Sequence, residues 1–245
     1  MDALEQLWKW LTDGANWAGR EGIPTRVLEH LETSGVALLA AVLVALPLGL
    51  YIGHARKGEF ITVTLANLGR AIPSFAVLAL AFPLALRFDL GFTIAPIVAA
   101  LFLLAIPPML LNTYVGVRGV DRDTVEAARG MGMAESGVLR SIELPLAAPV
   151  IVAGVRTSAV QVVATATLGA VVAGGGLGRY IVDGFAQQDY GMLLGGALLV
   201  ALLAMATELG LGLLERAVQP RTASKERHAE ESQVIGAPGG PPPGA

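Results

Sequence analysis

Residues 118–145 read RGVDRDTVEAARGMGMAESGVLRSIELP, and they lie between two long apolar runs at about residues 91–117 and 147–172. Charged residues recur along the whole segment, so it is too polar to lie in the hydrocarbon core of a membrane. It is also rich in residues that begin and end helices. We therefore expect a short folded unit at a membrane surface, and we refer to residues 118–145 as the platform.

The first half of the platform predicts a short helix. Asp123, with Glu126 three residues later, has the form of a capping box, in which an acidic N-cap and a second acid at N3 satisfy free backbone N–H groups. Two alanines follow and favour the helix. Gly130 and Gly132 should end it, because glycine readily takes the left-handed conformation found at helix C-termini.

The second half predicts another short helix at about residues 134–141. Pro145 then suits the first turn of the next membrane span, where its missing N–H costs nothing. The side chains expected near the platform surface are Val125, Met131, Met133, Val138 and Leu139. From the residues alone, this helix–turn–helix unit is either a surface displayed for a soluble partner or a connecting loop.

The composition predicts an all-α membrane protein. Hydrophobic residues make up 54% of the chain and charged residues only 15%, against about 25% charged in a typical soluble domain. A helix needs about 20 apolar residues to cross the hydrocarbon core. Five runs meet or approach that length, at about residues 35–53, 60–86, 91–117, 147–172 and 190–214.

The second of these runs is unusually long and contains Arg70, Pro73 and Pro83. Proline breaks the hydrogen-bond ladder of a helix, so we expect a kink within one tilted span. The alternative is two short helices, each too short to cross a membrane alone. We keep the count at five.

Basic residues predict how the spans are oriented, because Lys and Arg gather on the cytoplasmic side. With the N-terminus outside and the C-terminus inside, the cytoplasmic segments hold ten of the seventeen basic residues. These are Arg56, Lys57, Arg118, Arg122, Arg129, Arg140, Arg216, Arg221, Lys225 and Arg227. The short outer loops hold only Arg87 and Arg179, although Lys9, Arg20 and Arg26 at the amino end weaken the contrast.

The two ends of the chain differ from the spans in composition. Leucine and tryptophan recur at helical spacing in residues 4–11, which predicts a helix lying on the outer membrane surface. The carboxyl end becomes charged and then rich in proline and glycine, which predicts a disordered cytoplasmic tail. The expected organisation is an extracytoplasmic, interfacial segment over 1–33, a transmembrane domain over 34–217 and a tail over 218–245.

Several function classes find no support in the sequence. A net charge of −3 lacks the basic surplus of a nucleic-acid-binding protein. There is no cysteine, there are only three histidines, and neither GxSxG nor HExxH occurs, so we expect neither a catalytic residue nor a metal site. A membrane-embedded enzyme and a secondary transporter stay as alternatives, although the inverted repeats common in secondary transporters are not evident.

The platform sequence resembles the EAA motif of permease subunits of bacterial ABC importers. The matching positions are Glu126, Ala127, Ala128, Gly132, Ile142, Leu144 and Pro145. The resemblance implies the transmembrane-domain fold of type I ABC importers (the MetI-like fold), with about five core helices. It also implies that the platform is the coupling loop that docks on a cytoplasmic ATPase.

Other stretches resemble the osmoprotectant branch of these permeases, which includes transporters of glycine betaine, choline and proline betaine. They are residues 67–74 (NLGRAIPS), 111–120 (LNTYVGVRGV), 154–158 (GVRTS) and 174–181 (GGGLGRYI). A permease for another small solute, such as an amino acid, stays as the alternative. The branch implies a location in the bacterial plasma membrane, an extracytoplasmic binding protein and a second permease subunit, identical or related. ATP and Mg²⁺ would bind the partner ATPase, leaving this chain without a cofactor.

Three ionisable residues fall within the predicted spans: Arg70, Arg156 and Glu208. An ionisable side chain at bilayer depth usually faces a partner or a wet cavity. Arg156 and Glu208 lie at similar predicted depths from the cytoplasmic side, so we expect Glu208 to pair with Arg156 or Arg70. A role along the substrate path and snorkelling to the interface are the alternatives.

Uncharged residues in the spans, most of them polar, are further candidates for lining a path. They are Ser74 and Phe75 beside Pro73, then Asn112, Tyr114, Gln161, Thr165 and Thr167. Each also fits an ordinary packing role. The glycine run at 174–178 predicts a tight outer turn. Gly191 with Gly195 predicts close helix packing, either within one subunit or between two.

Overall fold

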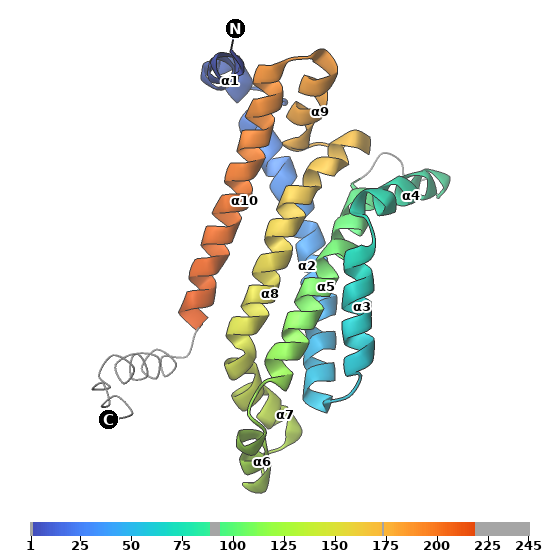
Figure 1. Cartoon of the computed structure of the whole chain (residues 1–245), viewed down its shortest axis with the longest axis vertical. Coiled ribbons are helices and arrows are strands. Elements are labelled where there is room, and N and C mark those ends of the chain that lie inside the picture. The colour runs from blue at the N-terminus through green and yellow to red at the C-terminus, as the bar shows by residue number, and fades with distance from the viewer. Residues whose placement is uncertain (1, 89–93, 173, 219–245) are drawn as a thin grey trace, which may run out of the picture.

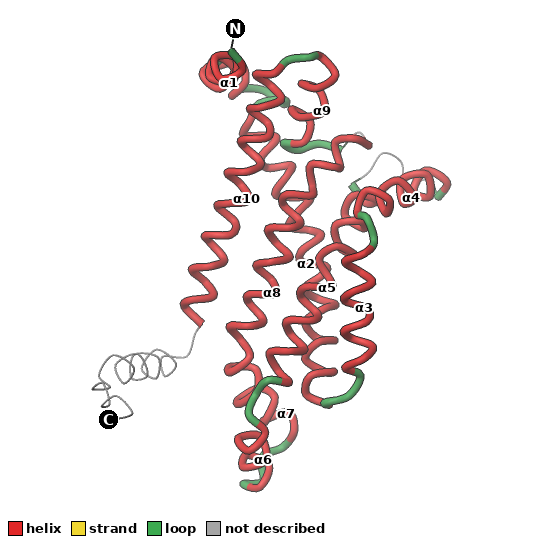
Figure 2. The backbone as a smooth tube through the Cα atoms, viewed as in Figure 1, coloured by secondary structure: helices red, strands yellow, loops and turns green. Residues whose placement is uncertain are grey.

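The computed structural model describes residues 2–88, 94–172 and 174–218, apart from the side chains of Ile61 and Arg70. Within those residues every regular element is helical (Figure 2). The α-helices are α1 Ala3–Thr12, α2 Ile23–Ala55, α3 Glu59–Ala71, α4 Ser74–Arg87, α5 Ala95–Arg118, α6 Arg122–Gly130, α7 Glu135–Val138, α8 Leu144–Thr165, α9 Gly178–Gln187 and α10 Tyr190–Val218. Gly14–Trp17 and Ala166–Val172 are 3₁₀ turns, and Leu139–Glu143 is a π turn. The bundle is elongated, with α6 and α7 at one end and α1 and α9 at the other (Figure 1).

Four helical stretches are long and apolar enough to cross a membrane. They are Ile23–Ala55, Ala95–Arg118, Glu135–Val172 and Tyr190–Val218. They agree with four of the five predicted spans, and three of them extend beyond the predicted limits. The first begins at Ile23, inside the segment expected to lie outside the transmembrane domain. Helical hydrogen bonding continues past the apolar residues, so hydropathy alone underestimates the length of such a helix.

The second predicted span forms two helices rather than one kinked helix. α3 and α4 are bent by 82° relative to each other. Pro73 has no N–H and disfavours helical geometry at the residue before it, and Ile72 is accordingly extended, with φ −76° and ψ 118°. The bundle therefore has four spans, or five if this bent pair counts as one broken span.

A stripe of small residues joins α2 to α5. Its members, spaced four residues apart and buried, are Ala37, Ala41, Ala45, Gly49 and Gly53. A Cβ added at Gly49 would lie 2.7 Å from the Cβ of Thr113, and one at Gly53 would lie 2.8 Å from the Cβ of Val117. Small residues at such spacing let two helix backbones approach closely. The stripe therefore holds α2 against α5 along most of the second half of α2.

Helix α8 packs on α5 and α2 through polar as well as apolar contacts. The buried Ser158 hydroxyl donates a hydrogen bond of 2.8 Å to the carbonyl of Ala105 in α5. The Nε2 atom of buried His30 in α2 lies 2.8 Å from the carbonyl of Val163 in α8. A buried polar group without a partner would be costly, so these two bonds set how α8 sits on its neighbours.

The N-terminal helix α1 packs across the end of α10 (Figure 1). A Cβ at Gly191 would lie 2.7 Å from the carbonyl oxygen of Gln6, and one at Gly195 would overlap the ring of Trp10. The Trp10 ring also meets Tyr180 edge to face, with centroids 5.0 Å apart. The two glycines thus serve packing within one chain, a choice that the sequence left open.

Helix α9 was not predicted, since its residues fall in an expected outer loop. Ahead of it, Gly176 has φ +84° and its backbone N–H donates a hydrogen bond of 2.8 Å to Glu29 Oε2 of α2. The glycine run therefore forms a tight turn, as expected, and it is tied to α2. The predicted disordered tail lies outside the described residues, except for its first residue, Val218.

Candidate functional site

The platform helix α6 is capped by Asp121 and not by Asp123 as predicted. The Asp121 carboxylate accepts hydrogen bonds from the Thr124 backbone N–H at 3.1 Å and from the Thr124 hydroxyl at 2.9 Å. Both bonds hold the pKa of Asp121 below its ordinary value, and the bond from the Thr124 hydroxyl has the larger effect. The helix therefore begins two residues earlier than a cap at Asp123 would allow, and Asp123 is an exposed first-turn residue.

Glu126 does not fold back to complete a capping box. It pairs instead with Arg122 one turn before it, with Nε and Oε1 2.7 Å apart. Glu126 and Ala127 are both exposed, whereas Ala128 is only 2% exposed. The three residues that open the EAA-like motif thus divide between an outward face and an inward face of α6.

A small hydrophobic core lies inside the platform. Its buried residues are Val120, Val125, Ala128 and Val138, with Met133 and Ile142 packed against them. Val125 and Val138, which we expected near the surface, are therefore internal. Of the apolar side chains predicted to be displayed, Met131 is the one that is largely exposed, at 79%. The platform is a packed unit rather than a loose connection.

The turn after α6 follows the prediction closely. Gly132 has φ +84°, the left-handed region that glycine adopts without a steric penalty. Arg129 then reaches across the turn to Glu135, where its Nε donates to Oε1 and its Nη2 donates to Oε2, both at 2.9 Å. This bidentate bond raises the pKa of Arg129 and lowers that of Glu135. The two helical parts of the platform are thereby held together by charge as well as by the core.

The second platform helix does not end before the next span. α7 continues through the π turn Leu139–Glu143 directly into α8, giving one helical stretch Glu135–Val172. Pro145 lies in the first turn of α8, as predicted, but the preceding residues are already helical. Leu144 and Pro145 are exposed and Ile142 is half-buried. Because the backbone is continuous, a displacement of α7 is carried into α8.

A hydrogen-bonded contact that the sequence did not predict joins the platform to α2. Glu143 is fully buried, and its Oε2 lies 2.5 Å from Nδ1 of His54. The other ring nitrogen of His54, Nε2, lies 3.2 Å from Oε2 of Glu135. In the sequence, the acidic residue between Ile142 and Leu144 was a sign of such a contact, but no sequence feature indicated that His54 is its partner.

Two of the three intramembrane charges lie together. Nη1 of Arg156 in α8 is 3.6 Å from Oε1 of Glu208 and 3.1 Å from Oε2 of Glu215, both in α10. The pair with Glu208 was expected, whereas Glu215 was not a candidate. The Arg70 side chain lies outside the described residues. Arg156 is therefore shared between two carboxylates.

The Arg156 cluster borders an open groove of about 530 Å³ between α5, α8 and α10. The residues lining it are Pro108, Arg156, Thr157, Val160, Gln161, Ala164 and Glu208. Three of the predicted path residues, Arg156, Gln161 and Glu208, thus meet at one surface. It offers a cation, an anion and two neutral hydrogen-bonding groups.

The remaining candidates are dispersed. Ser74 and Thr165 border one narrow pocket between α4, α5 and α8. Asn112 donates a hydrogen bond of 2.8 Å to the carbonyl of Pro108 in its own helix, and Tyr114 is buried in α5. Phe75 is about half exposed. Thr167 donates to the carbonyl of Ala164. The structure does not bring these residues to the groove.

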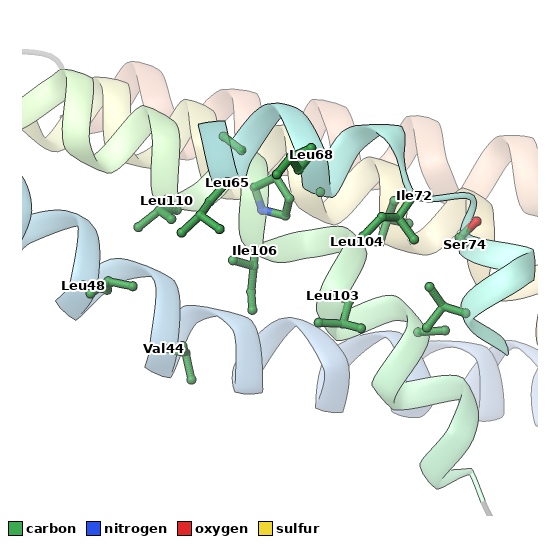
Figure 3. A pocket seen from close by; sticks show the side chains of 15 residues that line it. Val44, Leu48, Leu65, Leu68, Ile72, Ser74, Leu103, Leu104, Ile106 and Leu110 are labelled. Atoms are coloured by element: carbon green, nitrogen blue, oxygen red, sulfur yellow. The ribbon is translucent and has the colours of Figure 1, made fainter. Parts of the chain in front are cut away.

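A second cavity, of about 450 Å³, lies between α2, α3 and α5 (Figure 3). Aliphatic side chains such as Val44, Leu68 and Leu103 surround it, and Ser74 stands at its edge (Figure 3). Among the residues whose side chains the structure describes, none that lines it is charged. The described lining therefore offers no charge to an ionic solute, and the groove beside Arg156 is the better candidate for a polar one.

Comparison with known proteins places the chain among transport proteins. Residues 45–224 match the family described as binding-protein-dependent transport system inner membrane component. The choline transport system permease protein OpuBB of Bacillus subtilis is 39% identical over 195 residues, covering 80% of this chain and 88% of that protein. The glycine betaine/carnitine/choline transport system permease protein OpuCB of the same organism is 37% identical over 193 residues, covering 79% and 87%.

Two solved structures share the fold. The MetNI methionine ABC transporter in an inward-facing conformation aligns with a TM-score of 0.68 at 22% identity, covering 81% of this chain and 96% of that chain. An amino acid ABC transporter with histidines aligns with a TM-score of 0.64 at 18% identity, covering 80% and 93%. At these identities the likeness concerns the fold alone, which is the MetI-like arrangement expected from the sequence.

Proposed function

Because this chain belongs to the family of binding-protein-dependent transport system inner membrane components, we propose that it is the permease subunit of an ATP-driven importer of an osmoprotectant. The substrate is a quaternary amine such as choline, glycine betaine, carnitine or proline betaine. The observation that carries this proposal is the 39% and 37% identity to permeases named for such solutes. The amino acid transporters of similar fold are too distant to favour the alternative substrate class.

The platform is proposed to dock on a cytoplasmic ATPase subunit. Its exposed surface includes Glu126, Ala127 and Met131, and it projects beyond the spans at one end of the bundle (Figure 1). ATP and Mg²⁺ bind to that partner, so this chain transports without being an enzyme and holds no cofactor or metal ion. The packed core of the platform and the continuous helix from α7 into α8 support the transfer of ATPase movement to the spans.

The opposite end of the bundle is proposed to face the extracytoplasmic binding protein. Helices α1 and α9 lie there, while α10 runs toward the end that carries the platform (Figure 1). With the platform in the cytoplasm, we propose that the N-terminus lies outside and the C-terminus inside the plasma membrane of a bacterium. A second permease subunit, identical or related, completes the pathway.

The groove beside Arg156 is proposed to line that pathway. A zwitterionic solute carries a carboxylate, which Arg156 and Gln161 can bind, and a quaternary ammonium group, which Glu208 attracts. Arg156 is already paired with Glu208 and Glu215, so a passing solute exchanges contacts with an existing ion pair. That exchange favours weak, transient binding, which suits transport.

The test is reconstitution. The chain is assembled in liposomes with the ATPase, binding protein and any sister permease encoded beside its gene, and uptake of labelled choline, glycine betaine and carnitine is measured with and without ATP. Methionine and histidine serve as control solutes. We expect uptake of at least one quaternary amine that requires both ATP and the binding protein. Uptake of the amino acids alone, or none that depends on ATP, would contradict the proposal.

A further inference from the structure

The geometry points to His54 as a positioning residue that fixes the platform to the end of α2 through two carboxylates, Glu143 and Glu135. This inference rests on the proposed function of the platform as the surface that meets the ATPase. Through these contacts a displacement of the platform reaches α2. His54, Glu135 and Glu143 are not among the positions that define the EAA-like motif, so no residue of that motif supplies this connection.

The first step is the burial of Glu143. Its side chain is fully buried, His54 is its one ion-pair partner among the described residues, and its second oxygen, Oε1, has no hydrogen-bond partner there. A carboxylate removed from water in this way needs a compensating partner. The position of Glu143 is therefore set by His54, and moving one without the other leaves an uncompensated polar group inside the protein.

The second step is the rigidity of His54. It lies in the last turn of α2, next to Gly53, which closes the stripe of small residues packed on α5. A Cβ at Gly53 would lie 2.8 Å from the Cβ of Val117, so there is no room for α2 to slide independently at this point. His54 is thus anchored to both α2 and α5, and its ring is a fixed point against which the platform is held.

The third step is the π turn. Glu135 and Glu143 are eight positions apart, which on a regular α-helix would place them about 80° apart around the axis. A π turn accommodates one extra residue, so the same pair then differs by only about 20°. Both carboxylates consequently lie on one side of the helix and reach the two nitrogens of one imidazole, at 3.2 and 2.5 Å.

The fourth step extends the contact to α6. The same Glu135 carboxylate that meets His54 is held by Arg129 through two bonds of 2.9 Å. A continuous polar path therefore runs from α6 through α7 to α2. Arg56 adds a bond of 3.2 Å to the carbonyl of Val120, at the start of the platform, whereas the contacts of His54 reach α7 and the end of the π turn. His54 is the residue that holds the second half.

The consequence is that α2 depends on His54 to follow the second half of the platform. Covalent continuity carries a displacement of the platform into α5 at one end and, through α7, into α8 at the other, while His54 carries the same displacement to α2. Without His54, α2 would follow the movement of the platform and of α8 less closely. ATP hydrolysis by the partner would then be uncoupled from the opening of the pathway between these helices.

One test measures the position of the platform directly. The natural chain contains no cysteine, so Lys57→Cys and Met131→Cys introduce just two sites for spin labels on exposed positions of the α2–α3 turn and the α6 tip. Distances between the labels are measured on the full chain in lipid nanodiscs. We expect one narrow distribution in the otherwise natural chain and a broader or shifted one after His54→Gln or Glu143→Gln. Glu32→Gln, an exposed change at the far end of α2, should leave the distribution unchanged.

A second test measures coupling in the reconstituted importer. We expect His54→Gln and Glu143→Gln to keep ATP hydrolysis and to lower solute uptake per ATP by about fivefold or more, the usual range for coupled sites. The double variant should be no worse than His54→Gln alone, because His54→Gln already removes the contact with Glu143. Glu135→Gln changes an exposed side chain and should therefore leave folding intact. We expect it to lower solute uptake per ATP by a smaller factor.

Two results would overturn the inference: label distributions of natural width in His54→Gln and Glu135→Gln, or natural uptake per ATP in both. If Glu143→Gln fails to fold, Glu135→Gln still decides between these outcomes. The label distances do not depend on which solute is carried. A failure of uptake in the natural assembly would therefore count against the proposed function, while the distances would still support or refute the role of His54.

Discussion

Gly154 of α8 lies directly against Asn112 of α5, so closely that a Cβ at position 154 would come within 2.6 Å of the Asn112 Cβ and 3.1 Å of the Pro108 carbonyl oxygen. Two helices can approach this closely only where one of them lacks a side chain. The contact also explains why Asn112, a candidate for the solute path, is instead part of the α5–α8 interface.

We predict that Gly154→Val destabilises the chain by about 1–3 kcal/mol, because the added side chain has no space and the helices must separate. Gly210→Val is the matched control, since it changes a glycine of α10 with nothing within 4 Å of the new Cβ. Thermal unfolding in detergent measures both. Equal melting temperatures for the two variants would show that the α5–α8 contact is looser than described.

Gly132 and Gly130 provide a second matched pair at the end of α6. Neither position would meet another atom within 4 Å if it carried a Cβ, but Gly132 has φ +84° whereas Gly130 is helical. We expect Gly132→Ala to cost about 1 kcal/mol through backbone strain, and Gly130→Ala to be neutral or stabilising by about 0.5–1 kcal/mol.

The readout for this pair is the amount of ATPase subunit that co-purifies with the chain, together with hydrogen exchange across the platform. Gly132→Ala should lower the first and raise the second. If Gly130→Ala has the larger effect on either quantity, the left-handed turn is not what shapes the platform.

Substitutions of the two acids beside Arg156, Glu208 and Glu215, should differ in their effects on stability and on uptake. Glu215 is nearer to the guanidinium, at 3.1 Å, and its side chain is 19% exposed, whereas Glu208 lies at 3.6 Å and is 47% exposed. The less exposed pair contributes more to folding. We therefore expect Glu215→Gln to lower the melting temperature more, and Glu208→Gln to lower uptake more, since Glu208 borders the groove.

Melting curves and uptake assays on the same two preparations check this separation. The proposed path predicts that uptake by Glu208→Gln falls without a matching loss of folded protein. Natural uptake by that variant would remove Glu208 from the path.

The cap of α6 predicts a dependence on pH. The pKa of Asp121 is lowered in the folded chain by its bonds from Thr124. Its stabilising contribution is therefore fully present above the ordinary pKa of an aspartate and is lost as the pH falls through the lowered value. Hydrogen exchange of α6 should be faster in Asp121→Ala than in the natural chain at neutral pH, and the ratio should shrink in acid.

Comparing the two chains at each pH removes the intrinsic pH dependence of exchange. Asp123→Ala is the control, because Asp123 lies in the first turn and does not cap the helix. An equal effect of both substitutions would contradict the cap at Asp121 and favour the cap predicted at Asp123.

Much of the architecture could be predicted from local sequence. Apolar runs specify where helices cross the membrane because lipid offers no partner for free backbone groups, which forces those groups into helical bonds. The turn at Gly132 was likewise predictable, since it depends on the conformational range of one residue. At Pro73 the sequence predicted a kink within one span, whereas the structure has two separate helices bent by 82°. The EAA-like residues identified the platform before any contact was known.

The tertiary structure decided what those helices touch. Val125 and Val138 are internal because α6 and α7 fold on each other. The cap of α6 is Asp121, which accepts bonds from Thr124, and Glu143 meets a histidine 89 positions away. Sequence patterns report the preferences of a segment for helix, turn or lipid, which are local properties. Burial and ion pairing need a second surface, and only the folded chain brings that surface into contact.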